Sequence, residues 1–357
     1  MKRRVLVAMS GGVDSSVAAA LVVERGDEAV GVTMKILART ETGFGCCGSP
    51  ADVDDAKRVA EKLGMSHYVS DMAEIFESKV IRPYLDAYLG GSTPNPCVEC
   101  NRSLKFGHLL ALSEAWGCDA VATGHYARVE NGRLLKSLNP DKDQSYFLYA
   151  LDAKALARAD FPVGSMSKDA VRAKARELGL KTAEKPESME TCFVPNRDVR
   201  GFVAAHAAAD APGIKPGPIR DRSGKELGRH TGLASYTVGQ RSGLGLSGPE
   251  PRYVVRLDPV ENAVIVGGAD ETWSRKIVVG ALTWPHGAPS SPVSAAVRIR
   301  HRHTPAPATV TPGPDATATV LFEEPQRAPA PGQSAVFYSG DAVLGGGAIL
   351  RSFGGDA

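Results

Sequence analysis

Short apolar runs alternate with amphipathic stretches over the first 205 residues. The run at residues 5–9 is apolar, contains β-branched side chains and stops at two glycines, which is typical of a buried parallel strand. Further strands are predicted at residues 29–36, 66–69 and 119–122, and helices at residues 14–24, 52–63 and 104–116. Strands that alternate with helices predict an α/β fold built on a doubly wound parallel sheet.

The pattern changes further along the chain. Residues 152–179 have helical spacing, but 16 of the 24 prolines fall after residue 205, a density that helices tolerate poorly. A hairpin turn is predicted at residues 221–225, a linker at 287–292, and short strands at 253–257, 263–266, 297–299, 316–322, 335–338 and 342–344. We therefore expect an α/β domain with a helical extension at residues 1–208, a small β domain at 209–280, and a C-terminal antiparallel β barrel at 281–357.

Composition narrows the class of protein. Hydrophobic residues make up 43% and charged residues 23%, which excludes a wholly disordered chain. The net charge is +2, so any surface that binds nucleic acid must be a local patch. No apolar stretch has the length of a membrane span or a signal-peptide core, and we expect a cytoplasmic protein with no membrane contact.

The segment Ser10-Gly11-Gly12-Val13-Asp14-Ser15-Ser16 lies between the first predicted strand and the first predicted helix. Two glycines permit a tight turn, and the helix that follows offers its positive end and serine hydroxyls to an anion. An ordinary turn with a helix cap is the alternative, since Asp and Ser are common caps. Strand, turn and helix together favour a phosphate-binding loop, which is not a Walker A loop because the chain has no G-x-x-x-x-G-K-[ST] segment.

All six cysteines lie in the first 192 residues. In a reducing compartment such thiols are more often reactive or metal-binding than paired. Cys100 follows two prolines and precedes the helix predicted from residue 104, where the helix dipole favours a thiolate. Cys97 and Cys100 alternatively form half of a zinc site, or are two buried thiols. Spacing alone does not pair Cys100 with Cys192.

Seven motifs occur in the order of one known family. They are the glycine-rich loop, residues 93–101 (TPNPCVECN), Thr123-Gly124-His125-Tyr126, residues 142–148 (KDQSYFL), Cys192-Phe193, Gly239-Gln240-Arg241 and residues 331–338 (PGQSAVFY). Together they resemble the bacterial and organellar tRNA-specific 2-thiouridylases, which belong to the PP-loop ATP pyrophosphatases. The matches extend over nearly the whole chain.

The resemblance implies an enzyme that adenylates the C2 oxygen of the wobble uridine of tRNA and replaces it with sulfur. Cys192 would carry the sulfur as a persulfide, and Cys100 would be the partner nucleophile that cleaves the persulfide or closes a disulfide. ATP and Mg²⁺ would be needed. The residues expected to contact ATP are Ala8, Met9, Ser10, Gly11, Gly12, Val13, Asp14, Ser15, Met34 and Gly124.

The resemblance also implies two macromolecular partners, tRNA and a sulfur-donor protein of the persulfide-relay type. The residues expected to contact tRNA are Asn95, Pro96, Cys97, Lys142, Asp143, Gln144, Arg300 and His301. Residues 298–303 place three arginines at alternate positions, which in a strand would share one face and suit an RNA backbone.

One position departs from the family pattern, because Cys97 stands where the family often has Asp. Cys97, Cys100 and Cys192 could then hold a [4Fe-4S] cluster, or Cys97 merely replaces Asp in a site without a cluster. Asp14 could cap its helix or hold Mg²⁺. Cys46 and Cys47 either reach the same face of the protein as these three cysteines or belong to an incidental loop.

Two other functions stay open from the residues alone. One is a PP-loop synthetase or amidotransferase that adenylates a small molecule, which would need no pair of cysteines. The other is an RNA-binding protein without catalytic activity, which uses a nucleotide only to stabilise its fold.

Overall fold

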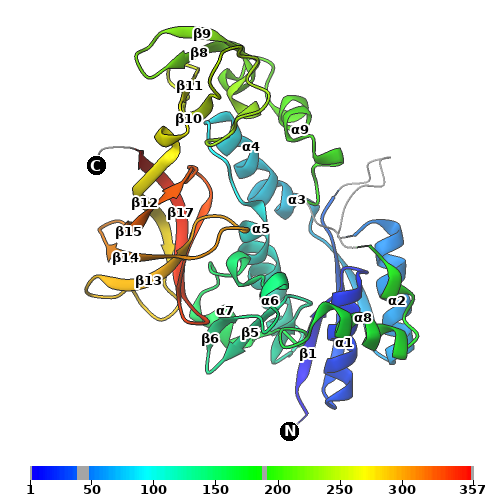
Figure 1. The fold of residues 1–357 in the computed structure, drawn as a ribbon. Helices are drawn as coiled ribbons and strands as arrows, with labels where there is room; N and C mark the ends of the chain where they lie inside the picture. Colours follow the sequence, from blue (N-terminus) through cyan, green and yellow to red (C-terminus); the bar gives the residue numbers. More distant parts are fainter. Residues whose placement is uncertain (1, 38–47, 187–190, 355–357) are drawn as a thin grey trace. The chain divides into compact units, whose positions relative to one another are not determined.

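The computed structural model describes residues 2–37, 48–186 and 191–354 (Figure 1). The chain forms two compact units. The first unit comprises Met1–Val80, Cys97–Arg197 and Asp341–Val343, and the second comprises Ile81–Pro96, Asp198–Gly340 and Leu344–Ala357. Each unit is therefore assembled from segments that are distant in the sequence.

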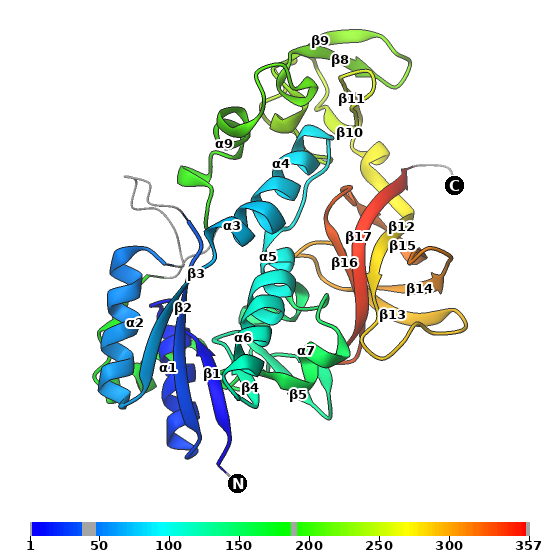
Figure 2. The same ribbon diagram turned by 180° about the vertical axis from the view of Figure 1, so that it is seen from behind.

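The first unit is built on a five-stranded sheet in the order β3-β2-β1-β4-β7. The strands are β1 (Arg4–Ala8), β2 (Glu28–Lys35), β3 (Ser66–Asp71), β4 (Ala120–Ala122) and β7 (Ala159–Asp160), and all neighbours are parallel (Figure 2). Val5 and Val7 point to one face of β1 and Leu6 to the other, and all three are fully buried. Both faces of the sheet are thus covered, which confirms the predicted doubly wound arrangement.

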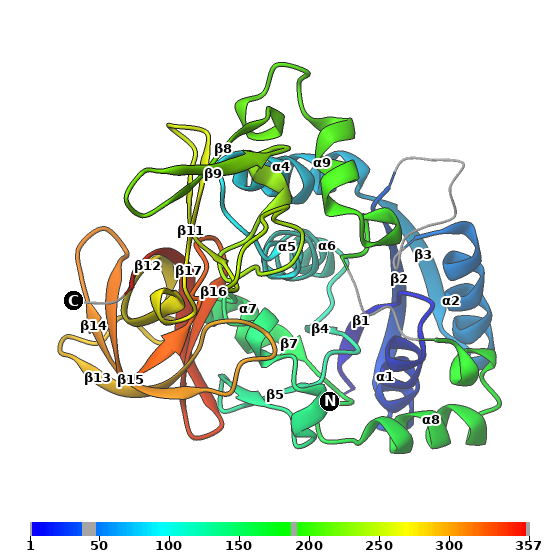
Figure 3. The same cartoon turned by 45° about the horizontal axis from the view of Figure 1, so that its top comes forward.

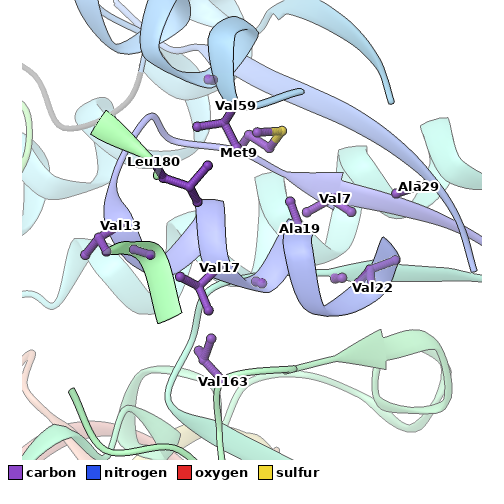
Figure 4. Packing of buried hydrophobic residues seen from close by; sticks show 14 of the residues in the cluster. Val7, Met9, Val13, Val17, Ala19, Val22, Ala29, Val59, Val163 and Leu180 are labelled. Atoms are coloured by element: carbon purple, nitrogen blue, oxygen red, sulfur yellow. The ribbon is translucent and has the colours of Figure 1, made fainter. Parts of the chain in front are cut away.

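Helix α1 (Val13–Glu24) is the centre of this unit's core. It is rich in Ala and Val on nearly all sides, which is typical of a helix that is buried between neighbours. It contacts the sheet, α2 (Pro50–Leu63) and α8 (Lys168–Glu177). In Figure 4, Met9, Val59 and Leu180 lie close together, and Val163 lies beside Val17.

Two helix predictions need correction. The stretch at 152–179 is not one helix, because α7 (Ala153–Arg158) is separated from α8 by β7 and by a turn that contains Pro162 and Gly164. Gly164 packs so tightly that a Cβ there would lie 1.8 Å from the Ala127 carbonyl oxygen. The helix predicted from residue 104 begins earlier, as α5 (Pro96–Glu99), and continues through π-helical η2 (Cys100–His108) into α6 (Leu109–Ala115).

The first unit also has a hairpin that was not predicted, β5 (Ala127–Glu130) and β6 (Arg133–Lys136). Asn131 and Gly132 connect the strands with positive φ values of 51° and 74°. Asn-Gly is the preferred pair for such a turn.

The second unit contains a helical part and a small sheet. Helix α4 (Arg82–Leu89) lies beside α9 (Val199–His206), and the rings of Tyr84 and Phe202 meet edge to face (Figures 1 and 2). The sheet has the order β10-β11-β8-β9 and consists of β8 (Gly217–Asp221), β9 (Glu226–His230), β10 (Tyr253–Asp258) and β11 (Ala263–Gly267). β8 and β9 are antiparallel, which confirms the hairpin turn predicted between them.

A closed six-stranded barrel completes the second unit (Figure 3). Its strands are β12 (Trp273–Thr283), β13 (Val293–Arg298), β14 (Ala306–Pro312), β15 (Ala318–Arg327), β16 (Ser334–Ser339) and β17 (Ala342–Gly354). β12 pairs with both β15 and β17, which closes the barrel and confirms the predicted class of this region.

Two expectations about this barrel are wrong in detail. Residues 287–292 connect β12 with β13 within one sheet, so they are a loop of the barrel and not a linker between domains. The alternating arginines do not share a strand face, because β13 ends at Arg298 and a turn follows in which the His303 amide donates to the Arg300 carbonyl.

Among the helices of the described ranges, none combines the length and apolar character needed to cross a bilayer.

Leu180 tests the packing around α1. Replacing Leu180 by Ala should lower the free energy of unfolding by about 2–5 kcal/mol, because the side chain is buried against α1 and its loss leaves a cavity. Exposed Leu138 in the same unit is the control, and Leu138→Ala should change stability by less than about 0.5 kcal/mol. Urea denaturation measures both variants, and equal effects would contradict the assigned core.

Candidate active site

The glycine-rich turn joins β1 to α1. Gly11 has φ +71°, and a Cβ there would lie 2.3 Å from the Asp52 carbonyl oxygen, so both the backbone and the space require glycine. Gly12 is the N-cap of α1, with extended backbone and no side-chain cap. The alternative of an ordinary Asp or Ser cap is therefore wrong. Amides of the first helical turn have no acceptor within the helix, so they are open to an anion.

Serine hydroxyls hold the turn in shape. The Ser16 amide and hydroxyl both donate to the Gly12 carbonyl oxygen, at 3.1 and 2.8 Å. The Ser15 hydroxyl donates to the same carbonyl at 3.1 Å and lies 3.2 Å from the Ser10 hydroxyl. These bonds direct the Gly12 carbonyl toward the helix, where it does not oppose an anion.

The turn opens into a cavity of about 270 Å³ in the first unit. Its lining includes every residue expected to contact ATP except Gly11, whose part is to shape the turn. The other lining residues are Asp52, Lys105, Thr123, His125, Tyr126, Lys142, Gln144, Lys168, Lys185 and Pro186.

Four lysines face this cavity, namely Lys105, Lys142, Lys168 and Lys185. They are accompanied by two carboxylates, those of Asp14 and Asp52. The excess of positive charge beside the helix terminus favours a ligand with several negative charges. Sequence reasoning missed three of the lysines because they come from different elements and no local motif marks them.

Asp14 is held by two partners from other parts of the unit. Lys168 donates to both carboxylate oxygens, at 2.7 and 2.9 Å, and the Tyr126 hydroxyl donates to Oδ1 at 2.7 Å. The Lys168 ammonium also lies 5.8 Å from the centre of the Tyr126 ring. The three side chains fix the first turn of α1 against α8 and the end of β4.

Gly124 and His125 follow β4 and form another wall of the cavity. A Cβ on Gly124 would lie 2.6 Å from the Ser15 amide nitrogen, so only glycine permits this contact with α1. His125 Nδ1 lies 2.7 Å from the Thr123 hydroxyl and Nε2 lies 3.4 Å from Lys105 Nζ. Burial, and next the Lys105 charge, hold the pKa of His125 well below its usual value. The neutral ring therefore accepts from Lys105 at Nε2.

The residues expected to contact tRNA are divided between the two units. Lys142 and Gln144 line the cavity, and Gln144 Oε1 accepts from the Tyr126 amide at 2.9 Å. Asp143 is buried, and its carboxylate accepts from the amides of Ser137 and Ser145 and from the Ser145 hydroxyl. The Asp143 carboxylate thus holds the turn that carries its neighbours, and a tRNA contact for Asp143 stays a prediction.

Asn95, Pro96, Arg300 and His301 belong to the second unit. Arg300 donates to the Arg327 carbonyl oxygen at 3.0 Å, and Arg298 donates to the His301 carbonyl oxygen. Arg300 and His301 are exposed. Their contact with tRNA stays a prediction.

The three cysteines of interest differ in environment. Cys97 is exposed, in the first turn of the helix that begins at Pro96, whereas Cys100 is half-buried in the next turn. The dipole argument for Cys100 is therefore wrong, because four residues of helix precede it. Cys192 is half-buried, and its neighbour Phe193 meets Phe76 edge to face with ring centres 5.5 Å apart.

The packing of Phe193 relates Cys192 to Cys100. Phe76 belongs to α3 (Ala73–Phe76), and α3 contacts η2, the helical segment that begins at Cys100. Asn101, the residue after Cys100, is buried, and its side-chain amide donates to the Phe147 carbonyl oxygen at 3.0 Å. Both cysteines therefore belong to segments packed on the same short helix. Cys46 and Cys47 lie outside the described residues.

The three thiols do not fit an iron–sulfur cluster. Within residues 2–37, 48–186 and 191–354, no three His, Cys, Asp or Glu side chains converge as a metal site would require. Cys97, Cys100 and Cys192 are all described and do not form such a group. The structure thus gives the predicted cluster no ligand set.

Comparisons with known proteins cover nearly all of the chain. Family models match residues 3–196 (tRNA methyl transferase HUP domain), 206–268 (tRNA methyl transferase PRC-barrel domain) and 274–349 (Aminomethyltransferase beta-barrel domain). The chain is 46% identical, over 98% of its length, to the tRNA-specific 2-thiouridylase MnmA of Geobacter metallireducens and covers 97% of that protein. It is 44% identical to the tRNA-specific 2-thiouridylase MnmA of Heliobacterium modesticaldum, over 99% of this chain and 94% of that protein.

Gly124 tests the contact between the end of β4 and α1. Gly124→Ala should weaken ATP binding by roughly tenfold or more, because the new Cβ must displace the first turn of α1. Gly248→Ala is the control, since a Cβ there meets nothing within 4 Å. Isothermal titration calorimetry measures both, and unchanged affinity in Gly124→Ala would contradict this geometry.

Substitution of His125 tests the electrostatics of the cavity wall that follows β4. The unfolded chain takes up a proton at this ring below a pH of about 6.5, whereas the folded protein does not, so folding stability falls as pH drops from about 6.5 to 5. His125→Gln should reduce that slope by up to about 1.4 kcal/mol per pH unit. Urea denaturation at several pH values measures the slope. Above a pH of about 7.5 the difference between the two proteins should be constant, because the ring is neutral in both states.

Proposed function

Since the chain belongs to the tRNA-specific 2-thiouridylase family, we propose that it carries out its ATP-dependent tRNA uridine thiolation at the cavity beside α1. One observation supports this location above the others. The open end of α1, shaped by Gly11 and Gly124, meets four lysines in a single cavity. Such a site favours a triphosphate and the charge that develops on departing pyrophosphate.

The residues of the cavity fit ATP. The first-turn amides of α1 and the lysines would hold phosphate oxygens, and Met34, which lies at the end of β2, offers an apolar side chain to a base. Asp14 and Asp52 are both already bonded to lysines. Mg²⁺ would therefore be held mainly by phosphate oxygens and water, as is usual for this ion.

We assign the first chemical step to this cavity. The C2 oxygen of the target uridine attacks the α-phosphorus of ATP, the bond to the β-phosphate oxygen breaks, and pyrophosphate leaves. The lysines and the amides of α1 stabilise the negative charge on that leaving group. The wobble position as the target, and Lys142 and Gln144 as tRNA contacts, are part of this proposal.

We assign the second step to Cys192 and Cys100. A persulfide on Cys192 attacks C2 through its outer sulfur, and the C2–O bond breaks to release AMP. The Cys100 thiolate then attacks the Cys192 sulfur, so that the outer sulfur stays on C2 and a Cys100–Cys192 disulfide forms. A thiol reductant must return two electrons before the next cycle. Packing of both segments on α3 supports the pairing.

The persulfide must come from outside the chain. A sulfur-donor protein that carries a persulfide is the expected source, and a cytoplasmic setting stays a prediction. Cys97 takes the place of the Asp that the family often has, in a site without a cluster. The small-molecule synthetase and the RNA-binding protein without catalysis are both less well supported. The relatives that match this chain over nearly their full length are named as tRNA-specific 2-thiouridylases.

Cysteine substitutions separate the two steps. Cys192→Ser and Cys100→Ser should abolish tRNA thiolation but retain tRNA-dependent pyrophosphate release, because the cavity of the first step contains neither thiol. The assays use unmodified tRNA, ATP and a persulfide donor, with organomercury gels to detect thiolated tRNA. Cys118→Ala is the control, since this buried thiol lies outside the cavity and should be dispensable.

Three outcomes would overturn parts of the proposal. Thiolation by Cys192→Ser would remove its role as sulfur carrier. Pyrophosphate release without tRNA but with a small acceptor would favour the synthetase. No pyrophosphate release under any condition would favour the protein without catalytic activity.

A further inference from the structure

Two of the seven sequence motifs take no part in the two proposed chemical steps. They are Gly239-Gln240-Arg241 and residues 331–338, and both belong to the second unit. Residues 93–96, the start of a third motif, belong to the same unit. Hydrogen bonds within this unit bring segments of all three motifs together at one residue, Thr93.

The main chain of Thr93 is bonded on both sides by the motif that begins at Pro331. The Thr93 amide donates to the Pro331 carbonyl oxygen at 2.8 Å, and Gln333 Nε2 donates to the Thr93 carbonyl oxygen at 3.0 Å. The main-chain amide of Gln333 donates to Ala330, so its side chain supplies the donor that a paired strand would supply. Gly332 has φ +87°, and a Cβ there would lie 2.8 Å from the Thr93 amide nitrogen, which requires glycine.

The side chain of Thr93 meets the turn that contains the other motif. Its hydroxyl donates to the Thr237 hydroxyl at 3.2 Å. Gln240 closes this turn, because its Oε1 accepts from the Thr237 amide at 3.1 Å and its amide donates to the Thr237 carbonyl oxygen at 3.0 Å. Gly239 and Gln240 also bond the main chain of Val254 in β10. The turn that holds the Thr93 hydroxyl is therefore fixed on the small sheet.

The two prolines after Thr93 make this residue decisive for the segment. Pro94 and Pro96 have no amide hydrogen, so Asn95 has the one main-chain donor in residues 94–96. Both rings fix φ, and a residue that precedes proline is restricted to extended backbone. The segment is thus stiff, and its direction is set at Thr93, where the amide, the carbonyl and the hydroxyl are all bonded.

We propose that Gln333 and Thr237 are positioning residues for the part of the tRNA-binding surface that Asn95 and Pro96 provide. They act through Thr93 and not on the RNA itself. The stiff segment carries the orientation of Thr93 forward to Asn95. This inference rests on the proposed function in taking Asn95 and Pro96 as tRNA contacts, and it gives the two remaining motifs a common role.

The test compares the affinities of the full-length protein for two ligands. Fluorescence anisotropy measures binding of unmodified tRNA at one salt concentration, and calorimetry measures binding of AMP-CPP with Mg²⁺. Gln333→Met keeps the length of the side chain but has no donor. It should weaken tRNA binding about fivefold or more and raise the KM for tRNA in pyrophosphate release equally, with kcat and AMP-CPP affinity changed by less than about twofold.

Substitution of Thr237 tests the second bond. Thr237→Val has the same shape without the hydroxyl and should weaken tRNA binding about threefold or more. Thr237→Ser keeps a hydroxyl and should bind tRNA within about twofold of the unsubstituted protein. Thr317→Val is the matched control, because the Thr317 hydroxyl donates to the Pro314 carbonyl oxygen in the same unit and its loss should leave tRNA affinity unchanged.

Hydrogen exchange at the Thr93 amide follows the anchoring directly. This amide is bonded to the Pro331 carbonyl oxygen, and its exchange should be faster in Gln333→Met than in the unsubstituted protein. In Thr317→Val the rate should be unchanged. Exchange that is equally slow in Gln333→Met would contradict the proposed part of Gln333.

The inference is overturned if Gln333→Met and Thr237→Val bind tRNA as the unsubstituted protein does, or if Thr317→Val loses the same affinity. It is also overturned if the affinities for tRNA and AMP-CPP fall together, since that indicates a general loss of structure. Failure of the proposed function shows differently, as pyrophosphate release by the unsubstituted protein with a small acceptor and no tRNA. An unsubstituted protein that does not bind tRNA would overturn both.

Discussion

In the proposed site the amides at the start of α1 must stay open to a ligand, and the surrounding residues leave them uncapped. The turn before the helix has space for glycine alone at Gly11, where Asp52 lies against it, and the end of β4 has space for glycine alone at Gly124. No side chain caps the helix, because Gly12 occupies the N-cap position. In most helices a Ser, Thr, Asp or Asn cap would use one of these amides, and its absence here leaves them open to an anion.

The distribution of charge around this helix terminus also favours an anion. Three of the lysines that face the cavity are held in place by bonds to acidic or neutral partners. Lys168 bonds Asp14, Lys185 bonds two carboxylates of α2, and Lys105 lies against neutral His125. Held side chains lose little conformational entropy when a ligand arrives, so the site is organised before binding.

The fold could be predicted from the sequence to the extent that each element has a local signal. The parallel sheet, the hairpin of β8 and β9 and most barrel strands follow from apolar runs and turn residues. The prediction was wrong where a local signal was misleading. Strand β7 has two residues and lies in a stretch of helical composition, and β14 carries prolines that argue against a strand.

The sequence by itself determined the glycine-rich turn and the family of the chain, because these rest on local motifs in a fixed order. Only the tertiary structure decided which charged side chains meet. Lys105, Lys168 and Lys185 come from three separate elements, and the distance between them in the sequence carries no information about their distance in space. It also decided that Asp143 is buried and that Cys100 lies inside a helix, since burial and helix limits depend on what packs against a segment.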